Sequence, residues 1–224
     1  MARTLMALII IATTALSTQA CKQFMPGKNT DGKVKFMVGD VTVNGKKATL
    51  GDTVRFDDVI ETGDRSICHI TIGEKNIIAL WPGARFLYRV TTRGSNCELS
   101  RGGLGALLRN KNLTGDMNIK TPTVTASVRG TILCLTAESN EKIYTCVCNG
   151  RIRFKPEAGG GIFTKSAQDA GEKLVSANHH SGHYFTREQG AIKIEKAGLK
   201  HHTDEGVEKM AASIGEKVDW TKIE

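Results

Sequence analysis

Histidines gather near the C-terminal end of this 224-residue chain, as His179-His180 and His183 followed by His201-His202. Imidazole is a common ligand of zinc and copper, so two or three of these side chains, together with Asp204, could hold a metal ion. The stretch lacks His-Glu-x-x-His, the helical signature of zinc peptidases, and the small polar residues around it indicate an exposed loop. We therefore predict no metal site and no cofactor, and keep metal or small-ligand binding by this His-rich region as the alternative function.

The cysteines are the second group of residues with possible chemistry. Cys146 and Cys148 are two positions apart, so in a strand both sulfurs lie on one face. Cys134 precedes them across a predicted turn, and one of the two could form a disulfide with it. Cys68 and Cys97 alternate with apolar residues and are candidates for a second disulfide, with buried free thiols as the alternative. One intervening residue is fewer than paired zinc ligands usually have, which disfavours a metal role for the pair 146 and 148.

Signatures of catalysis are missing from the sequence. It has no Gly-x-Ser-x-Gly elbow, phosphate loop or dinucleotide fingerprint. Asp52 and Asp58 are placed like turn and cap residues, not like a catalytic pair. The net charge is +8, from lysines and arginines spread along the chain without a basic helix or zinc-finger spacing. We interpret this charge as promoting solubility, expect no nucleic-acid partner and predict a protein that is not an enzyme.

An export signal is predicted for residues 1–20. Arg3 precedes an apolar run, Leu5–Leu16, that is shorter than the about 20 residues needed to span a bilayer. Cys21 follows small residues, as in bacterial lipoprotein signals, so we predict that Cys21 is lipidated; cleavage before an unmodified cysteine is the alternative. Residues 21–33 are polar and suit a tether. We expect an exported chain in the periplasm or at the cell surface, anchored by lipid to a bacterial membrane.

Short strands separated by turns fill most of the remaining sequence. Residues 66–72 alternate between apolar and polar side chains, and Asn44-Gly45 is a dipeptide that hairpins prefer. Thr131–Thr136 and Lys142–Cys148 are expected to pair as a hairpin. At least ten such strands predict an all-β fold, either a sandwich, a barrel or a short solenoid.

The pattern changes at Pro156. A glycine-rich loop and a few strand-like pieces follow, and apolar residues between 207 and 214 then recur at helical spacing. This spacing predicts a short amphipathic helix over 203–215. We therefore divide the mature chain into a β domain over 34–155 and a C-terminal extension over 156–224.

The order of these strands and turns resembles a FecR domain over residues 36–155. The stretches that carry the resemblance are Gly39-Asp40-Val41, Leu50-Gly51-Asp52, Asp58–Gly63, Ser66, Thr121–Thr131 and Asn149–Ile152. Within the most distinctive of them, five residues form the family motif: Thr121, Pro122, Arg129, Gly130 and Thr131. Pro122 favours an extended Thr121, and Gly130 suits a turn. We interpret Arg129 as an internal bridge that fixes a turn, with a contact to a partner as the alternative.

What the resemblance implies is a module for protein contact. FecR proteins are inner-membrane regulators that pass an iron-uptake signal from an outer-membrane receptor to a sigma factor, and they carry a cytoplasmic segment and a transmembrane helix before this domain. The present sequence shows neither, so only the exported β module is carried over. We expect a non-enzymatic lipoprotein of the bacterial envelope whose FecR-like domain acts as an interaction or sensory module, with another envelope protein as its partner.

Overall fold

The computed structural model describes residues 30–109, 113, 115–157 and 171–223. Within these ranges the chain forms sixteen strands and one helix, which confirms the predicted all-β class with a short C-terminal helix. The predicted export signal, the lipidation site Cys21 and the glycine-rich loop lie outside the described residues. No helix in the described part of the chain has the length and apolar character to cross a bilayer.

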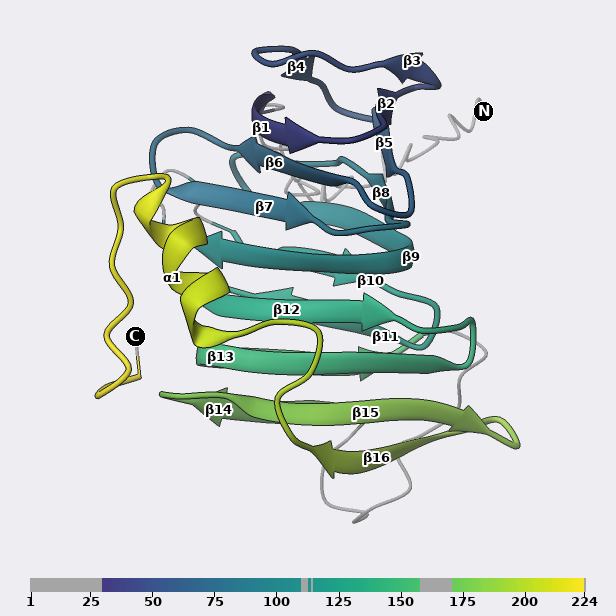
Figure 1. The fold of residues 1–224 in the computed structure, drawn as a ribbon. Helices are drawn as coiled ribbons and strands as arrows, with labels where there is room; N and C mark the ends of the chain where they lie inside the picture. The colour runs from purple at the N-terminus through teal and green to yellow at the C-terminus, as the bar shows by residue number, and fades with distance from the viewer. Residues whose placement is uncertain (1–29, 110–112, 114, 158–170, 224) are drawn as a thin grey trace, which may run out of the picture.

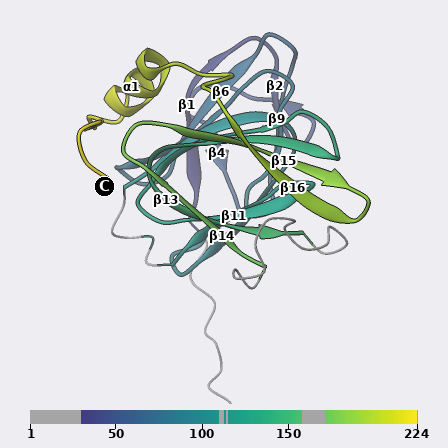
Figure 2. The ribbon, with the colours of Figure 1, turned by 90° about the horizontal axis from the view of Figure 1, so that it is seen from below.

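The strands form a sandwich of two layers (Figures 1 and 2). The front sheet has the order β4 (Thr53–Val54), β1 (Gly32–Val38), β6 (Ile67–Thr71), β7 (Asn76–Leu80), β9 (Ser95–Leu108), β12 (Ile132–Ala137), β13 (Lys142–Pro156), β15 (Ser181–Glu188) and β16 (Ala191–Ala197). The back sheet has the order β3 (Lys46–Lys47), β2 (Val41–Val43), β5 (Val59–Thr62), β8 (Arg85–Leu87), β9, β10 (Met117–Lys120), β11 (Val124–Val128), β13 and β14 (Lys173–Ala177). All pairs are antiparallel except β9 with β10.

Strands β9 and β13 belong to both sheets because each bends at a glycine. Residues up to 101 of β9 pair in the back sheet, and residues from Gly102 onward pair in the front sheet. Gly102 has a φ of 71°, and a Cβ there would lie 2.5 Å from the backbone of Ala84. Gly150 makes the same transition in β13, with a φ of 114°. Only glycine combines such a backbone angle with so close an approach.

The main core fills the space between the two sheets. It draws on both layers, because alternate residues of each strand point inward. Its largest fully buried members include Phe86, Tyr88, Phe154, Phe185 and Leu99. The alternation predicted for residues 66–72 is confirmed, since Cys68, Ile70 and Ile72 are buried in this core.

The C-terminal extension completes the same sandwich. Strands β14 and β15 pair with the two halves of β13, and β16 pairs with β15. Helix α1 (Asp204–Ala212) then lies against the front sheet, over β7 and β9. Thr203 caps the helix, because its hydroxyl accepts a hydrogen bond from the N–H of Gly206 at 3.1 Å. The predicted helix is confirmed, with Gly215 at a φ of 72° just beyond its end.

Candidate functional site

We call the surface of the front sheet that faces away from the main core its outer face. This face carries a second apolar cluster. Helix α1 covers this cluster. The sheet contributes Ile77, Ala79, Leu107, Ile132, Cys134, Tyr144, Cys146 and Cys148, and the helix contributes Val207, Met210 and Ala211. One face of an antiparallel sheet commonly meets water. Here the chain covers that face partly with its own last helix.

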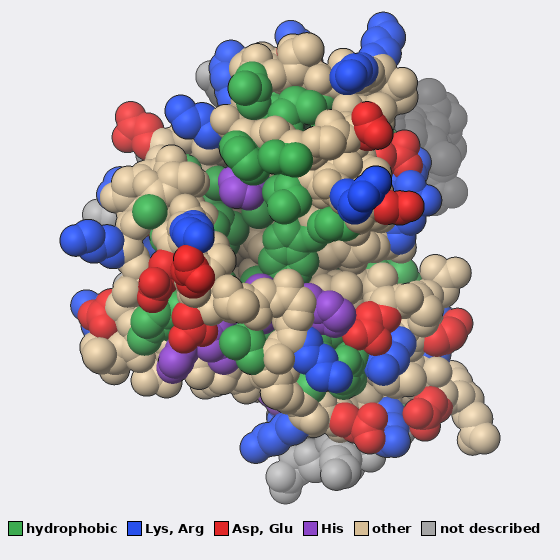
Figure 3. All heavy atoms as spheres, viewed as in Figure 1, with side chains coloured by type: hydrophobic (Ala, Val, Ile, Leu, Met, Phe, Trp, Pro, Cys, Tyr) green, Lys and Arg blue, Asp and Glu red, His purple; other side chains and the backbone are tan. Residues whose placement is uncertain are grey.

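Beside α1, the outer face forms an open groove with a volume of about 1070 Å³. Hydrophobic side chains gather at the centre of this face in Figure 3, and those lining the groove include Phe36, Trp81 and Met210. Glycines of β9 make the room, because a Cβ on Gly103 would lie 2.6 Å from Cε3 of Trp81. The Trp81 ring therefore contacts the β9 backbone directly. The ring can lie there because Gly103 has no side chain.

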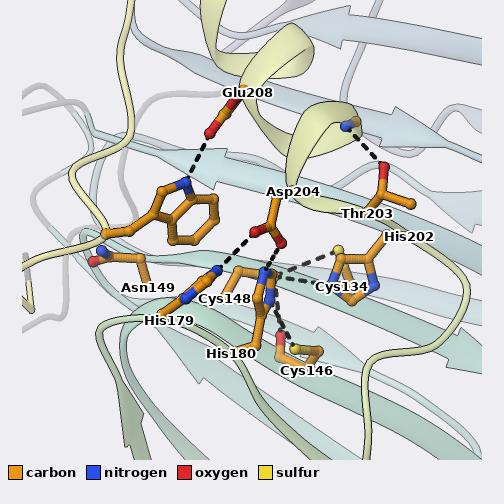
Figure 4. Close-up of polar contacts among 12 residues, drawn as sticks. Cys134, Cys146, Cys148, Asn149, His179, His180, His202, Thr203, Asp204 and Glu208 are labelled. Carbon is orange, nitrogen blue, oxygen red and sulfur yellow. Dashed lines mark hydrogen bonds and ion pairs between the residues drawn. The ribbon is translucent and has the colours of Figure 1, made fainter.

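Four side chains that commonly bind metals meet beside the groove, at the N-terminal end of α1 (Figure 4). They are Cys146, Cys148, His180 and His202, which we call the Cys/His cluster, and their ligand atoms all lie within 4.8 Å of one another. Sγ of Cys146 is 3.4 Å from Nδ1 of His180, and Sγ of Cys148 is 3.4 Å from Nε2 of His202. Each thiol thus faces one imidazole nitrogen.

Three separate segments bring the Cys/His cluster together. Cys146 and Cys148 both point outward from β13, as their spacing predicts. His180 lies in the turn between β14 and β15 with a φ of 52°, and its N–H donates to the carbonyl of Cys148 at 3.1 Å. His202 lies in the connection from β16 to α1. A non-glycine residue with positive φ is uncommon and tends to occur where surrounding structure holds it in place, which this backbone hydrogen bond does.

Hydrogen bonds to the outer ring nitrogens orient both histidines. Asp204, the first residue of α1, accepts from Nε2 of His180 at 2.6 Å and from Nε2 of His179 at 2.8 Å. Nδ1 of His202 donates to the carbonyl of Lys200 at 2.7 Å. Because a neutral imidazole has one N–H and one lone pair, the nitrogens facing the thiols are those with the lone pairs. The hydrogen bond from His179, followed by the one from His180, lowers the pKa of Asp204, which keeps it ionised.

Both thiols of the cluster are held protonated in the structure as it stands. The hydrogen bond with Cys148, and then burial, raise the pKa of Cys146 to about 12. Burial raises the pKa of Cys148 well above its usual value. The two imidazoles act in the opposite direction on Cys146, lowering its pKa, but they do not outweigh these effects.

The C-terminal tail closes over the histidine side of the cluster. Trp220 packs on the rings of His179 and His180, with centroids 4.8 and 5.0 Å away, and its indole N–H donates to Glu208 at 2.8 Å. Asn149 is fully buried beneath the tail. Its Nδ2 atom lies within 3.1 Å of three carbonyl oxygens, those of Asn178, Asp219 and Lys222.

The cysteines for which disulfides were predicted are free thiols in this structure. Cys134 is opposite Cys146 in the β12–β13 pair, while its Sγ is 3.7 Å from Sγ of Cys148. Cys68 and Cys97 are buried in the main core, and Cys97 accepts the N–H of Arg89 at 3.4 Å. The structure therefore brings Cys134 next to the predicted pair, and both disulfides stay predictions.

The structure brings His179 and His180 together with Asp204, as the sequence suggested, but His183 and His201 lie apart from this group. His183 is buried on β15, with Nδ1 3.4 Å from the carbonyl of Ser181, and His201 pairs with Glu138 at 3.1 Å. One histidine of each adjacent pair, His180 or His202, meets the two cysteines whose spacing disfavours a metal role. The spacing of the cysteines already placed both sulfurs on one face, but the pairing of β13 with β14 and β15 is needed to see which histidines reach them.

The residues of the predicted family motif lie in two turns of the sandwich. Thr121 is buried and its hydroxyl donates to a carbonyl three residues later, at 2.6 Å. Gly130 has a φ of 61°, and the buried hydroxyl of Thr131 lies 3.1 Å from the carbonyl oxygen of residue 151. The Arg129 side chain is exposed and has no ion pair with a residue that the structure describes, so its role as an internal bridge that fixes a turn stays a prediction.

Residues 58–153 match the sequence model of the FecR protein family. The chain carries a FecR domain. The match begins just before β5 and ends within β13, so the FecR domain forms the centre of the sandwich and includes β9 and most of β13, the two strands that change sheets. The matched range includes Cys146 and Cys148 but not the last three residues of β13, and His180 and His202 lie after it.

Two crystal structures of a "putative anti-sigma factor" from Parabacteroides distasonis ATCC 8503, at 2.50 and 1.65 Å, are similar to the chain. Each shares 14% sequence identity with it, with a TM-score of 0.47 over 62% of this chain and 59% of the solved chain. The chain thus spans about three fifths of their length. No curated protein sequence matches the chain. The identification of the FecR domain accordingly rests on the match over 58–153.

Proposed function

We propose that this protein is an exported, lipid-anchored FecR-domain protein that acts in the bacterial envelope as a protein-interaction or sensory module without catalysis. The FecR match over residues 58–153 carries the proposal, because the FecR proteins that the sequence resembles are regulators. The signal-like segment at residues 1–20 and the cysteine that follows it support export and lipid attachment.

The groove on the outer face is the surface that best suits a protein partner. Its lining combines the aromatic rings of Phe36 and Trp81 with Met210, a side chain that adapts to different shapes. Phe36 is 45% exposed although it is large and apolar, and Lys209 places a positive charge at the groove. Apolar surface rimmed by polar groups is typical of protein contacts. We propose that apolar side chains from a segment of another envelope protein bind in this groove.

Site-specific photocrosslinking in living cells tests this assignment. A photoreactive amino acid at Phe36 is expected to give a crosslink to one defined envelope protein. The matched control carries the same group at Leu174, which is 60% exposed on β14 in the back sheet. Identical crosslinks from positions 36 and 174, or crosslinks from neither, would contradict a partner at the groove.

Mass spectrometry of the mature N-terminus tests the lipid separately. We expect a diacylglyceryl modification on Cys21 that a Cys21→Ser substitution abolishes. A mature chain with an unmodified Cys21 would remove the lipid from the proposal and leave the interaction module untouched.

A further inference from the structure

We propose that Cys146, Cys148, His180 and His202 bind one divalent transition-metal ion, and that Zn²⁺ is the ion their chemistry fits best. This goes beyond the proposed function, because a module for protein contact needs no metal. The ligand set is assembled by the complete fold: Cys146 is 34 residues from His180 in sequence, and Cys148 is 54 residues from His202.

The geometry of the Cys/His cluster is close to a tetrahedral zinc site. With zinc–sulfur bonds of about 2.3 Å and zinc–nitrogen bonds of about 2.0–2.1 Å, neighbouring ligand atoms in a tetrahedron lie about 3.3–3.8 Å apart. The Cys146–His180 and Cys148–His202 sulfur–nitrogen distances are both 3.4 Å, and all four ligand atoms lie within 4.8 Å of one another. Only small side-chain movements are needed for an ion to sit among them.

The histidines are already set as ligands. Metal-bound histidines usually donate their second ring N–H to a carboxylate or a backbone carbonyl, which fixes the tautomer and makes the other nitrogen more basic. His180 donates to Asp204, and His202 donates to the carbonyl of Lys200. Both kinds of supporting partner are therefore present, and each lone pair points at a thiol of the cluster.

Charge and burial favour an ion with two positive charges. Cys146 and Cys148 are buried, and their two thiolates would neutralise Zn²⁺, so no net charge is left in the apolar surroundings. On binding, Zn²⁺ replaces two thiol protons, which leave to solvent, and two metal–sulfur bonds form. A tetrahedral set of two sulfurs and two nitrogens is typical of zinc, while hard ions such as Mg²⁺ prefer oxygen.

Adjacent histidines supply matched controls for a binding experiment. His180→Asn and His202→Asn remove a ligand, whereas His179→Asn and His201→Asn change the neighbouring residue and leave the ligand set intact. Asparagine is chosen because it tolerates the positive φ of His180 and His201, which are 52° and 63°. Circular dichroism and gel filtration verify that each variant is folded.

The binding experiment uses the purified chain with its thiols reduced under anaerobic conditions. Co²⁺ serves as a coloured probe and Zn²⁺ competes for it in the presence of a chelator. We expect one equivalent of Co²⁺ per chain, with a thiolate-to-cobalt charge-transfer band that Zn²⁺ abolishes. The two ligand variants are expected to weaken binding at least about tenfold, and the two control variants less than about threefold.

Three results would overturn the site. They are a fully reduced, folded protein that takes up no Co²⁺, bound Co²⁺ without a thiolate band, and equal affinities for His180→Asn and His179→Asn. Photocrosslinking from position 36 detects the protein partner and does not require a bound metal. The metal site and the proposed function can therefore be disproved independently of each other.

Discussion

Cys68 and Cys97 are buried in the main core, and burial raises the pKa of each thiol to about 12. In the unfolded chain a thiol has a pKa near the ordinary value of 9.0. Between these values the unfolded chain loses the proton and the folded protein keeps it. The stabilisation from each neutral thiol is therefore complete below pH 9 and is lost as the pH rises toward 12.

Replacing one of these thiols should make the protein less sensitive to alkali. We expect the unfolding free energy of the wild type to fall more steeply with pH than that of Cys68→Ala, by up to about 1.4 kcal/mol per pH unit above pH 9. Urea denaturation at a series of pH values measures both slopes, and the titration of lysines and tyrosines cancels in the comparison. Parallel curves would show that Cys68 titrates normally in the folded state.

Asn149 anchors the C-terminal tail by a single buried amide. Asn149→Ala should leave the carbonyls of Asp219 and Lys222 without this donor and destabilise the protein by about 1–3 kcal/mol. Limited proteolysis should then cut the tail near Trp220 faster than in the wild type. Asn178→Ala, which removes one exposed hydrogen bond to the same tail, serves as the milder control. Equal cutting rates in both variants would contradict the anchoring role of Asn149.

Single residues could be predicted from the sequence where their partners are close along the chain. Asp52 accepts two hydrogen bonds from Thr49, and Asp58 accepts one from the N–H of Arg55, so the expected turn roles are confirmed. The Cys/His cluster was missed because its contacts cross strands far apart in sequence. The pattern Cys146-x-Cys148 predicts that both sulfurs lie on one face of a strand. Nothing local in the sequence indicates which histidines lie close to that face.

Among the secondary-structure elements, strand β9 owes its bend to one glycine, Gly102. Gly102 and Gly130 have similar φ angles, 71° and 61°, but a Cβ at Gly130 would meet nothing within 4 Å. Gly130→Ala should therefore cost only the backbone strain, about 1–2 kcal/mol. Gly102→Ala should cost clearly more, because the methyl group would also collide with the Ala84 backbone.

Chemical denaturation of the two variants separates strain from collision. The difference between their unfolding free energies reports the close approach at β9 alone, since the φ penalty is common to both. A difference near zero would mean that β8 can move away from β9, and the bend would then not be fixed by glycine.

Elements were predicted well when a local signal defined them. Asn44 and Gly45 have φ angles of 51° and 73°, as the predicted hairpin requires, and the hairpin of β12 with β13 forms. The glycines at 102 and 103 lie inside one strand, because β9 continues through them. A bend and a turn have the same glycine signal, and only the neighbouring Ala84 backbone distinguishes them.

For the molecule as a whole, the predicted division between a FecR-like domain and an extension is based on sequence composition. The contacts between strands cross this division. Strand β13 runs across the predicted boundary at residue 155, and β14 and β15 pair along its two halves. The change in composition at Pro156 was real, but strand pairing with β13 joins the two parts. Sequence composition reports local preference, and the pairing that unites a sandwich is long-range.

Removing the last helix should uncover the outer face without unfolding the sandwich. A chain that ends after residue 202 keeps all described strands but loses the burial of Val207 and Met210, worth about 3–6 kcal/mol together. We expect lower stability in urea, binding of a hydrophobic dye, and unchanged β-sheet circular dichroism. Unchanged stability would mean that α1 contributes no net packing energy on Ile77 and Leu107.

Residues 198–203 join helix α1 to β16, and the tail after the helix is held by Asn149, so α1 can be compared with a ligand linked to its own receptor. A short tether of this kind gives an effective concentration on the order of millimolar. Any protein that uses the sheet surface beneath α1 must compete with it. The apparent affinity of such a protein equals its intrinsic affinity multiplied by the fraction of molecules in which α1 has dissociated from the sheet.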